Sequence, residues 1–375
     1  MYIKFLNIFR QDKKIQNLLS RKLQSFFKTG NFILGKEVEL FENNFKKYFN
    51  AKHCISCANG SDALYMSIMS LNLKKKSEIL IPGMTYIATA HAAQKAGMKI
   101  KLVDTDKSGC LDFVDLKKKI TNKTKALIVV NLYGQKSVSS QIIRLCNKFK
   151  VKIIEDSAQG HAIFDCENCD HNKNKAKMCC KKKIYQPSQT DISCFSFFPG
   201  KNLGCYGDGG AIITNNTKYE RFIRAFRNNG SINKKNYTYI GINSRLDAIQ
   251  ACILNLKIKY LKENNIKRMH NAEFFYKNIK NKKILPIQQR KGSVFHQFII
   301  SSKNRDFFCK YLKKKNIEFG IHYNKAIDQY KVYRFLKNQN LKNAYEIAKN
   351  YLSIPVDPHL TDKEREYIVS TINKY

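Results

Sequence analysis

The chain has 375 residues, 43% of them hydrophobic, which is enough to bury a large core and suggests two domains. No apolar run approaches the roughly 18 residues of a membrane span, and charge interrupts the N-terminus too early for a signal peptide. We therefore expect a soluble cytoplasmic protein.

The 68 Lys and Arg residues against 29 Asp and Glu give a net charge of +39, but they are spread along the whole chain. Without a nucleic-acid-binding motif, they indicate a solvated surface, with polyanion binding as the alternative.

Strands alternate with helices over the first two thirds of the chain. Apolar runs predict strands at residues 78–83, 99–104, 125–134, 151–157, 191–198 and 209–214. Helical patterns lie between them at residues 62–71, 87–97 and 137–149. This alternation predicts an α/β fold with a mostly parallel central sheet that helices cover on both faces.

The pattern changes at about residue 245, where longer helical segments begin. Strands are expected near residues 294–301 and 317–323, and Pro286 and Gly292 indicate a connecting loop. The chain is therefore predicted to divide into a large α/β domain, residues 1–244, and a smaller α+β domain, residues 245–375.

Two polar segments at predicted strand and helix ends suggest a binding site, because ligands of open α/β sheets gather where strands end. Asp156 follows one strand, and a buried carboxylate there requires a cation such as a protonated ring nitrogen, unless it caps a helix. Gly60 and Ser61 precede a helical pattern, where free amides suit a phosphate. The alternative is that Ser61 is an ordinary N-cap.

A tyrosine and a lysine complete this pattern. Tyr86 lies just past a strand, where its ring either stacks on a flat ligand or belongs to the core. Lys201 follows Pro199 and Gly200, and burial there would free its amine to attack a carbonyl, whereas a surface lysine is the alternative. These residues would meet a phosphate, an aromatic ring, a pyridinium and an aldehyde, and pyridoxal 5′-phosphate (PLP) carries all four groups.

Ten blocks in chain order carry a resemblance to a known family. They include SCANGSDAL (56–64), IPGMTYIATA (81–90), IIEDSAQGHA (153–162), FSFFPGKNLG (195–204) and GINSRLDAIQACIL (241–254). On these blocks the chain resembles the DegT/StrS nucleotide-sugar aminotransferases, which are PLP-dependent enzymes of fold type I. The resemblance implies that Lys201 forms an imine with the cofactor and then moves a proton between Cα and C4′.

The same resemblance implies roles for further residues. Asp156 would keep the pyridine nitrogen protonated, and Gln159 would hydrogen-bond the phenolic oxygen of the cofactor. The other expected contacts are the phosphate ligands Gly60, Ser61 and Ser196, the stacking ring of Tyr86, Asn243 reaching the partner's phosphate across a homodimer, and His322 and Tyr323 at the sugar pocket.

The expected reaction transfers an amino group from L-glutamate to a keto group of a nucleotide-linked sugar for surface polysaccharide or lipopolysaccharide. The form PGKNLG followed by GDGGA favours amination at C3, with C4 as the alternative. Some relatives are dehydratases in which histidine replaces the lysine, but position 201 is lysine. An alternative of another class is a regulatory or polyanion-binding protein on an inherited enzyme fold.

The chain departs from the family pattern in an insert at about residues 165–189. We interpret this insert as a basic surface loop without metal. Zinc binding is the alternative, because the insert carries several soft ligands: Cys166, Cys169, His171, Cys179 and Cys180. Asn131 and Asn229 also stand where relatives often have histidine.

Overall fold

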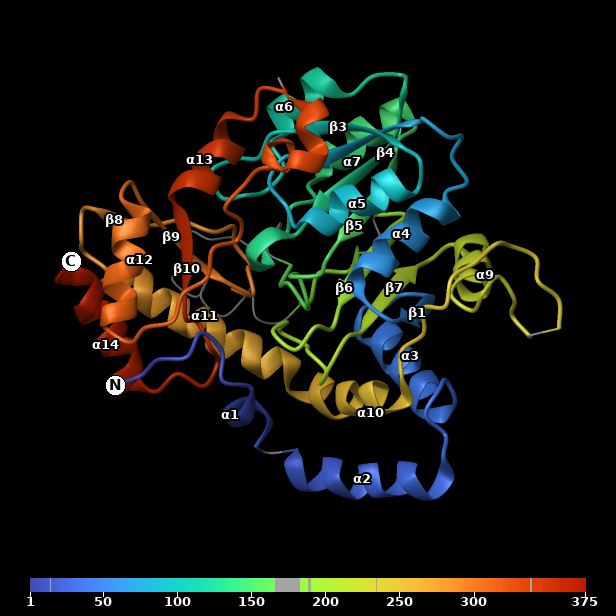
Figure 1. The fold of residues 1–375 in the computed structure, drawn as a ribbon, viewed down its shortest axis with the longest axis horizontal. Coiled ribbons are helices and arrows are strands. Elements are labelled where there is room, and N and C mark those ends of the chain that lie inside the picture. Colours follow the sequence, from blue (N-terminus) through green and yellow to red (C-terminus); the bar gives the residue numbers. More distant parts are fainter. Residues whose placement is uncertain (14, 166–182, 188–189, 234, 338) are drawn as a thin grey trace.

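The larger sheet has seven strands in the order β1-β7-β6-β5-β4-β2-β3 (Figure 1). The structure is a computed structural model that describes residues 1–13, 15–165, 183–187, 190–233, 235–337 and 339–375. Neighbouring strands run parallel from β3 to β6: β3 (Lys99–Val103), β2 (Glu78–Pro82), β4 (Thr124–Val130), β5 (Lys152–Asp156) and β6 (Ile192–Ser196). β7 (Gly210–Thr214) and β1 (His53–Cys57) pair antiparallel at the other edge. The predicted mostly parallel α/β sheet is confirmed.

Helices cover both faces of this sheet. On β2, Ile79 and Ile81 pack in one cluster with α4 (Gly60–Ser70) and α5 (Ile87–Lys95). Leu80, between them, points to the opposite face, toward α6 (Phe113–Lys119) and α7 (Ser140–Phe149). Because both faces are buried, the strands are apolar at successive positions, which made them visible in the sequence.

A second group of helices packs on the β6 side of the sheet. α3 (Lys36–Tyr48) brings Phe41 and Phe45 edge-on to Phe197 and Phe195, with ring centroids 5.2 and 5.0 Å apart. α2 (Gln16–Thr29) and α10 (Ala248–Lys257) belong to the same cluster, and α9 (Thr217–Phe226) packs beside α4. The division predicted at residue 244 stays a prediction, with α10 packed on α3.

A smaller antiparallel sheet, β10-β9-β8, forms the C-terminal part: β8 (Ile284–Pro286), β9 (Phe298–Ser302) and β10 (Tyr351–Ile354). It shares a core with α11 (Leu261–Asn278), α12 (Arg305–Lys314) and α14 (Asp362–Asn373), whereas α13 (Lys342–Asn350) packs against the larger sheet's core. The N-terminal stretch joins this part, since Ile3 pairs with Ile317, and α1 (Ile8–Asp12) follows it. The two chain termini therefore lie on the same side of the molecule (Figure 1).

Several predicted boundaries are wrong. Residues 317–323 do not form a strand, because they make only two isolated bridges, from Ile317 to Ile3 and from Gly320 to Ser353. Pro286 ends β8 and does not lie in a loop, although Gly292 does. The predicted strand 125–134 stops at Val130, and the short strands β1, β8 and β10 were not predicted. Among the helices that the structure describes, none has the length and apolarity needed to span a membrane.

A buried ion pair ties α3 to α9. Glu42 accepts hydrogen bonds from the Ser56 amide at 2.9 Å and from Arg227 at 2.7 Å, and Arg224 lies 3.1 Å from its second oxygen. Burial alone would raise the pKa of Glu42, but the two arginines lower it overall. The carboxylate therefore contributes stability in its charged form.

We predict that Glu42→Gln lowers the free energy of unfolding by about 3 kcal/mol at pH 7, because it leaves Arg227 buried without a counter-charge. The difference should be complete above the ordinary glutamate pKa of about 4.3 and shrink as pH falls through the lowered folded pKa. Urea denaturation across this pH range measures it. The control Glu263→Gln, at an exposed pair with Lys267, should cost less than about 1 kcal/mol. Equal effects of the two variants would contradict the prediction.

Candidate active site

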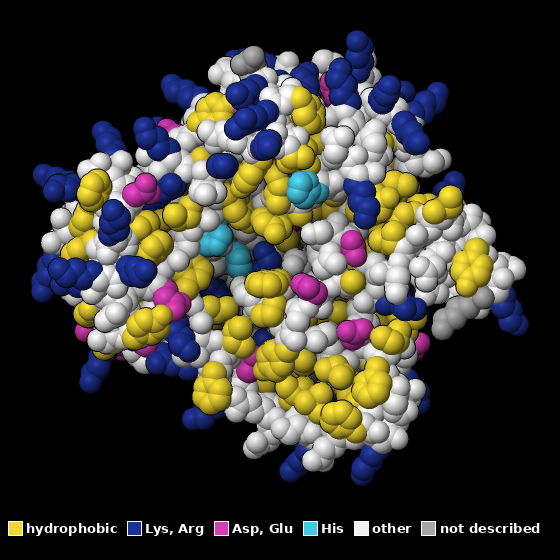
Figure 2. Space-filling view, viewed as in Figure 1, with side chains coloured by type: hydrophobic (Ala, Val, Ile, Leu, Met, Phe, Trp, Pro, Cys, Tyr) yellow, Lys and Arg dark blue, Asp and Glu magenta, His cyan; other side chains and the backbone are white. Residues whose placement is uncertain are grey.

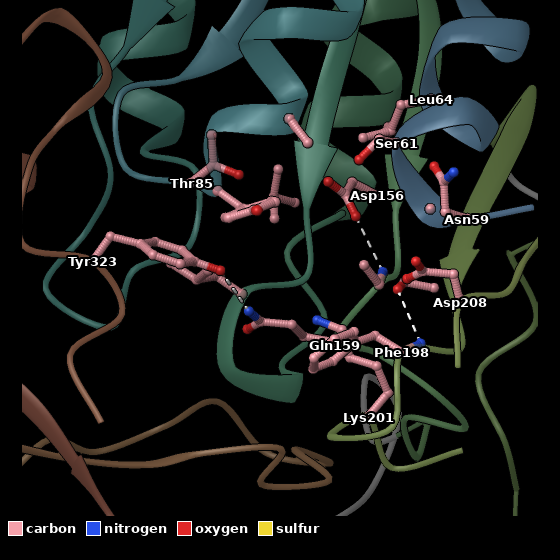
Figure 3. A pocket seen from close by; sticks show the side chains of 17 residues that line it. Asn59, Ser61, Leu64, Thr85, Asp156, Gln159, Phe198, Lys201, Asp208 and Tyr323 are labelled. Atoms are coloured by element: carbon pink, nitrogen blue, oxygen red, sulfur yellow. Dashed lines mark hydrogen bonds between the residues drawn. The ribbon is translucent and has the colours of Figure 1, made fainter. Parts of the chain in front are cut away.

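A cavity of about 330 Å³ opens where the parallel strands end (Figure 3). Its walls come from the segments that follow β1, β2, β4, β5 and β6 and from the C-terminal part of the chain, which supplies Tyr323. It contains most of the candidates chosen from the sequence: Gly60, Ser61, Tyr86, Asp156, Gln159, Ser196, Lys201 and Tyr323.

Asp156 is the last residue of β5 and is buried. One carboxylate oxygen accepts a hydrogen bond from the Ala158 amide at 3.1 Å and the other accepts one from the Thr89 hydroxyl at 3.2 Å. No helix starts after Asp156, so the N-cap alternative is wrong. Burial raises the pKa of Asp156, and the Ala158 amide and the charge of Lys201 oppose that rise. The carboxylate is therefore suited to meet a cation in the cavity.

Lys201 lies in the turn after β6, where its backbone N–H donates to the Phe198 carbonyl at 2.8 Å. The side chain lines the cavity and is partly buried, so the surface alternative is wrong. Burial lowers the pKa of Lys201 to about 8, although the carboxylate of Asp156 acts in the opposite direction. A useful fraction of the amine is consequently unprotonated, and nucleophilic, near neutral pH.

The start of α4 forms one corner of the cavity. The N-cap is Asn59, whose side-chain oxygen accepts from the Asp62 amide at 2.8 Å, so Ser61 is not the cap. The amides of Gly60 and Ser61 fall in the first turn, where N–H groups have no partner within the helix. A Cβ on Gly60 would lie 2.7 Å from Cβ of Ser196, so only glycine allows this approach. The corner offers backbone donors and two hydroxyls to an anion.

Gln159 and two tyrosines line the other side. The Gln159 carbonyl accepts from the Tyr133 amide at 2.6 Å, and its NH₂ group donates to the Tyr323 hydroxyl at 3.1 Å. Tyr86 is 55% exposed, so it is not a core residue, and its ring lies 5.6 Å from the ring of Tyr323. These aromatic faces suit a planar ligand.

Two predicted residues lie outside this cavity. Asn243 is exposed and does not line it, although its neighbour Ser244 donates to Asp62 of α4 at 2.7 Å. His322 lines a second cavity and bonds Ser353 at 3.0 Å. The zinc candidates Cys166, Cys169, His171, Cys179 and Cys180 fall outside the described residues.

Sequence reasoning missed several residues of the site. Thr89 donates a hydrogen bond to Asp156, and its hydroxyl lies 3.0 Å from the Thr85 hydroxyl. The sequence marks Thr89 only as a hydroxyl residue within an alanine-rich helix. Phe198 and Asp208 also line the cavity. In the sequence, Phe198 precedes the segment that contains Lys201, and Asp208 lies between two glycines. Only the folded structure shows that both residues line the cavity.

Comparison with known proteins gives matches over nearly the whole chain. The profile of the DegT/DnrJ/EryC1/StrS aminotransferase family matches residues 13–373. The dTDP-3-amino-3,6-dideoxy-alpha-D-galactopyranose transaminase of Aneurinibacillus thermoaerophilus is 36% identical, with 98% of this chain and 96% of the relative covered. The UDP-2-acetamido-2-deoxy-3-oxo-D-glucuronate aminotransferase of Pseudomonas aeruginosa is 33% identical, with 96% of each covered.

A solved structure is similar along its full length. The structure of DesV from S. venezuelae, in complex with a ketimine intermediate, superimposes with a TM-score of 0.91 at 26% sequence identity. The comparison covers 100% of this chain and 98% of that one. The fold, the cavity and the sequence matches thus point to the same group of proteins.

We predict that the amine of Lys201, in protein freed of carbonyl compounds with hydroxylamine, reacts with acetic anhydride with a midpoint near pH 8. Asp156→Asn should move this midpoint to lower pH, because the carboxylate opposes the effect of burial. Peptide mass spectrometry measures the labelling at each pH. Lys152, whose pKa is raised by its hydrogen bond to Asp191, is the internal reference and should label at higher pH. Identical midpoints for the two lysines would contradict the lowered pKa.

Proposed function

Because the chain belongs to the DegT/DnrJ/EryC1/StrS aminotransferase family, we propose that it uses PLP to transfer the amino group of L-glutamate to the C3 keto group of a nucleotide-linked deoxy sugar, for example a dTDP-3-keto-6-deoxyhexose. The observation that carries this proposal is that Lys201, with its lowered pKa, shares one cavity with the buried Asp156. An amine nucleophile and a carboxylate for a pyridinium are the two groups that the cofactor's chemistry requires.

The residues present fit PLP. The α4 corner, with Gly60, Ser61 and Ser196, suits its phosphate, and the carboxylate of Asp156 and the amine of Lys201 line the same cavity. The cavity volume of about 330 Å³ is within the usual range for a ligand of this size. Tyr86 would cover one face of the ring, and Gln159 would lie at the phenolic oxygen.

When bound, PLP supplies an aldehyde carbon and a protonated ring that withdraws electrons from it. Asp156 would hold the proton at the pyridine nitrogen, because its buried negative charge would stabilise a pyridinium. The amine of Lys201 would hold the aldehyde carbon and, when free, would move a proton between the donor and the cofactor. The Tyr323 hydroxyl and the Tyr133 amide fix the Gln159 side chain in one orientation.

The two halves balance with water, which is taken up when 2-oxoglutarate forms and released when the keto oxygen of the sugar is replaced. The amino nitrogen and two electrons leave L-glutamate, which departs as 2-oxoglutarate. The same nitrogen and electrons then reach the keto carbon of the sugar, which becomes an amino sugar. Lys201 and Asp156 serve both halves, since the second half reverses the first on a different substrate.

Two observations support amination at C3. The names of the two sequence relatives both place the amino or keto group at position 3 of a sugar. The segment from Pro199 to Ala211 also has the form expected of enzymes that act at this carbon. The cationic side chains are spread around the face shown in Figure 2 and are not gathered in one patch, so this face does not favour polyanion binding.

We also propose a homodimer. Exposed apolar side chains on α2, on α3 and on the segment between them include Leu18, Phe27, Phe32, Ile33 and Leu40, and Figure 2 shows apolar side chains gathered toward the lower edge of this face. A patch of this kind on a folded protein marks an interaction surface. Asn243 is exposed beside the segment that contacts α4, which suits a residue that reaches the site of a second copy.

We predict that the protein, incubated with L-glutamate, PLP and a panel of 3-keto and 4-keto nucleotide sugars, aminates a 3-keto sugar. Lys201→Arg should lower the rate by about 10²–10⁴-fold or more, because it removes the group that carries the proton. Mass spectrometry and NMR of the products measure both. Amination only at C4 would contradict the position, and no amination of any keto sugar would contradict the substrate class.

Gly60→Ala should weaken PLP binding about tenfold or more, because the new methyl group meets Ser196 in the corner that suits the phosphate. Pyridoxal, which lacks the phosphate, should lose little affinity. Absorbance titration of the cofactor-free protein with each compound measures the two constants, and urea denaturation checks the fold. Equal losses for PLP and pyridoxal would contradict the proposed phosphate corner.

A further inference from the structure

A second cavity, of about 260 Å³, adjoins the first. Gln159, Phe198, Lys201 and Tyr323 line both, so the two cavities meet at the amine of Lys201 and the Gln159 amide. The remaining lining includes Phe5 and Leu6 of the N-terminal stretch, Arg268 of α11, and His296, Gln297 and His322 of the C-terminal part. Its volume is below the roughly 300 Å³ at which sites for larger ligands begin, so it suits a small molecule.

Arg268 is a buried cation without a matching anion. It lies on α11, is 3% exposed and lines this cavity. Its Nε has no hydrogen-bond partner, and one terminal nitrogen makes only a long bond of 3.4 Å to the Val356 carbonyl. Within the described part of the chain, no carboxylate lies within ion-pair distance of it. Burial lowers the pKa of Arg268 to about 10, and the charge of Asp357 only partly opposes this.

The nearby acid is already committed elsewhere. The two carboxylate oxygens of Asp357 accept from the backbone amides of Asn7 at 2.8 Å and His359 at 2.7 Å. A buried guanidinium that lacks a protein counter-ion is costly. A ligand that brings its own negative charge would remove this cost.

The other polar groups in the cavity fit an anion that also carries donors. Burial and the charge of Lys201 lower the pKa of His322 to about 4 and that of His296 to well below its ordinary value, so both rings are neutral. The Gln297 side-chain oxygen is buried without a partner and can accept a hydrogen bond. Arg268 and Lys201 are therefore the cationic groups that line the cavity.

The N-terminal stretch closes the cavity on one side. The Phe5 amide donates to Glu318 at 2.6 Å, and the Phe5 ring lies 5.9 Å from the His322 ring. An apolar wall beside a buried cation strengthens the attraction for a carboxylate, because water that would screen it is displaced. Arg is also the side chain whose fork of donors matches a carboxylate.

We infer that the second cavity binds a carboxylate of the amino-acid donor, with Arg268 as the residue that recognises it. This inference rests on the proposed function in one respect, that an amino acid gives its nitrogen at Lys201. A donor held by Arg268 would lie beside the amine that both cavities share.

The test measures binding separately from turnover. Calorimetric titration with glutarate, a dicarboxylate that has no amine to react, should give an apparent Kd about 10- to 100-fold higher for Arg268→Gln than for the unchanged protein. Arg268→Lys should recover part of the loss. Arg290→Gln, at an arginine that pairs with Asp106 outside both cavities, is the matched control and should leave the Kd unchanged. Protein without added PLP is titrated too, so a failed cofactor assignment does not remove this readout.

The donor half-reaction separates the possible carboxylates. Loss of the PLP absorbance is followed with L-glutamate, L-glutamine and 4-aminobutyrate, which carry both carboxylates, only the α-carboxylate and only the distal one. Arg268→Gln should raise KM for donors that keep the recognised carboxylate more than it lowers kcat. The sugar half-reaction, started from the aminated cofactor, reports whether the variant is folded.

Three results would overturn the inference. One is an unchanged glutarate Kd in Arg268→Gln. Another is an equal loss in both half-reactions, which would make Arg268 a structural residue. The third is a loss confined to UDP-glucuronate binding, which would assign the cavity to a sugar carboxylate. Failure to aminate any sugar, with a changed glutarate Kd, would contradict the proposed substrate and leave this inference supported.

Discussion

The attraction between a buried carboxylate and an amine organises the centre of this protein. Asp156 and Lys201 approach the cavity from the ends of neighbouring strands, and each changes the pKa of the other against the effect of burial. A buried aspartate alone would take up a proton, and a buried lysine alone would lose more of its charge. Because each group opposes the effect of burial on the pKa of the other, both can exchange a proton with a ligand in the shared cavity.

The parallel sheet brings these groups together. The carboxyl ends of β2, β4, β5 and β6 lie at one edge, so residues as far apart in sequence as Thr85 and Lys201 surround one space. Helix α4 points its first turn into the same space, and Gly60 allows it to pack directly on Ser196. The antiparallel strand β7 pairs with β6, and the Glu42–Arg227 ion pair stabilises the same side of the sheet.

The C-terminal part adds selectivity to this centre. Tyr323 reaches the first cavity, and Arg268, His296 and His322 surround the second one, with Lys201 between the two. An aminotransferase must accept two different substrates at one amine. Of the two adjoining cavities, the first offers the backbone amides and aromatic faces proposed to hold PLP, and the second carries the cation proposed to hold the donor's carboxylate.

The sequence by itself determined the strands that are buried on both faces, because their continuous apolar runs have no other explanation, and it also determined the block pattern around Lys201 and Asp156. It did not reveal β8 and β10, which have only three and four residues, or β1, whose partner β7 lies far away in the chain. Nor did it distinguish Arg268 among 68 basic residues or show that Asn243 stays outside its own cavity. Burial, and the presence or absence of a counter-charge, are properties of the surroundings. Only the tertiary structure decides them, because the neighbours of each side chain come from distant segments of the chain.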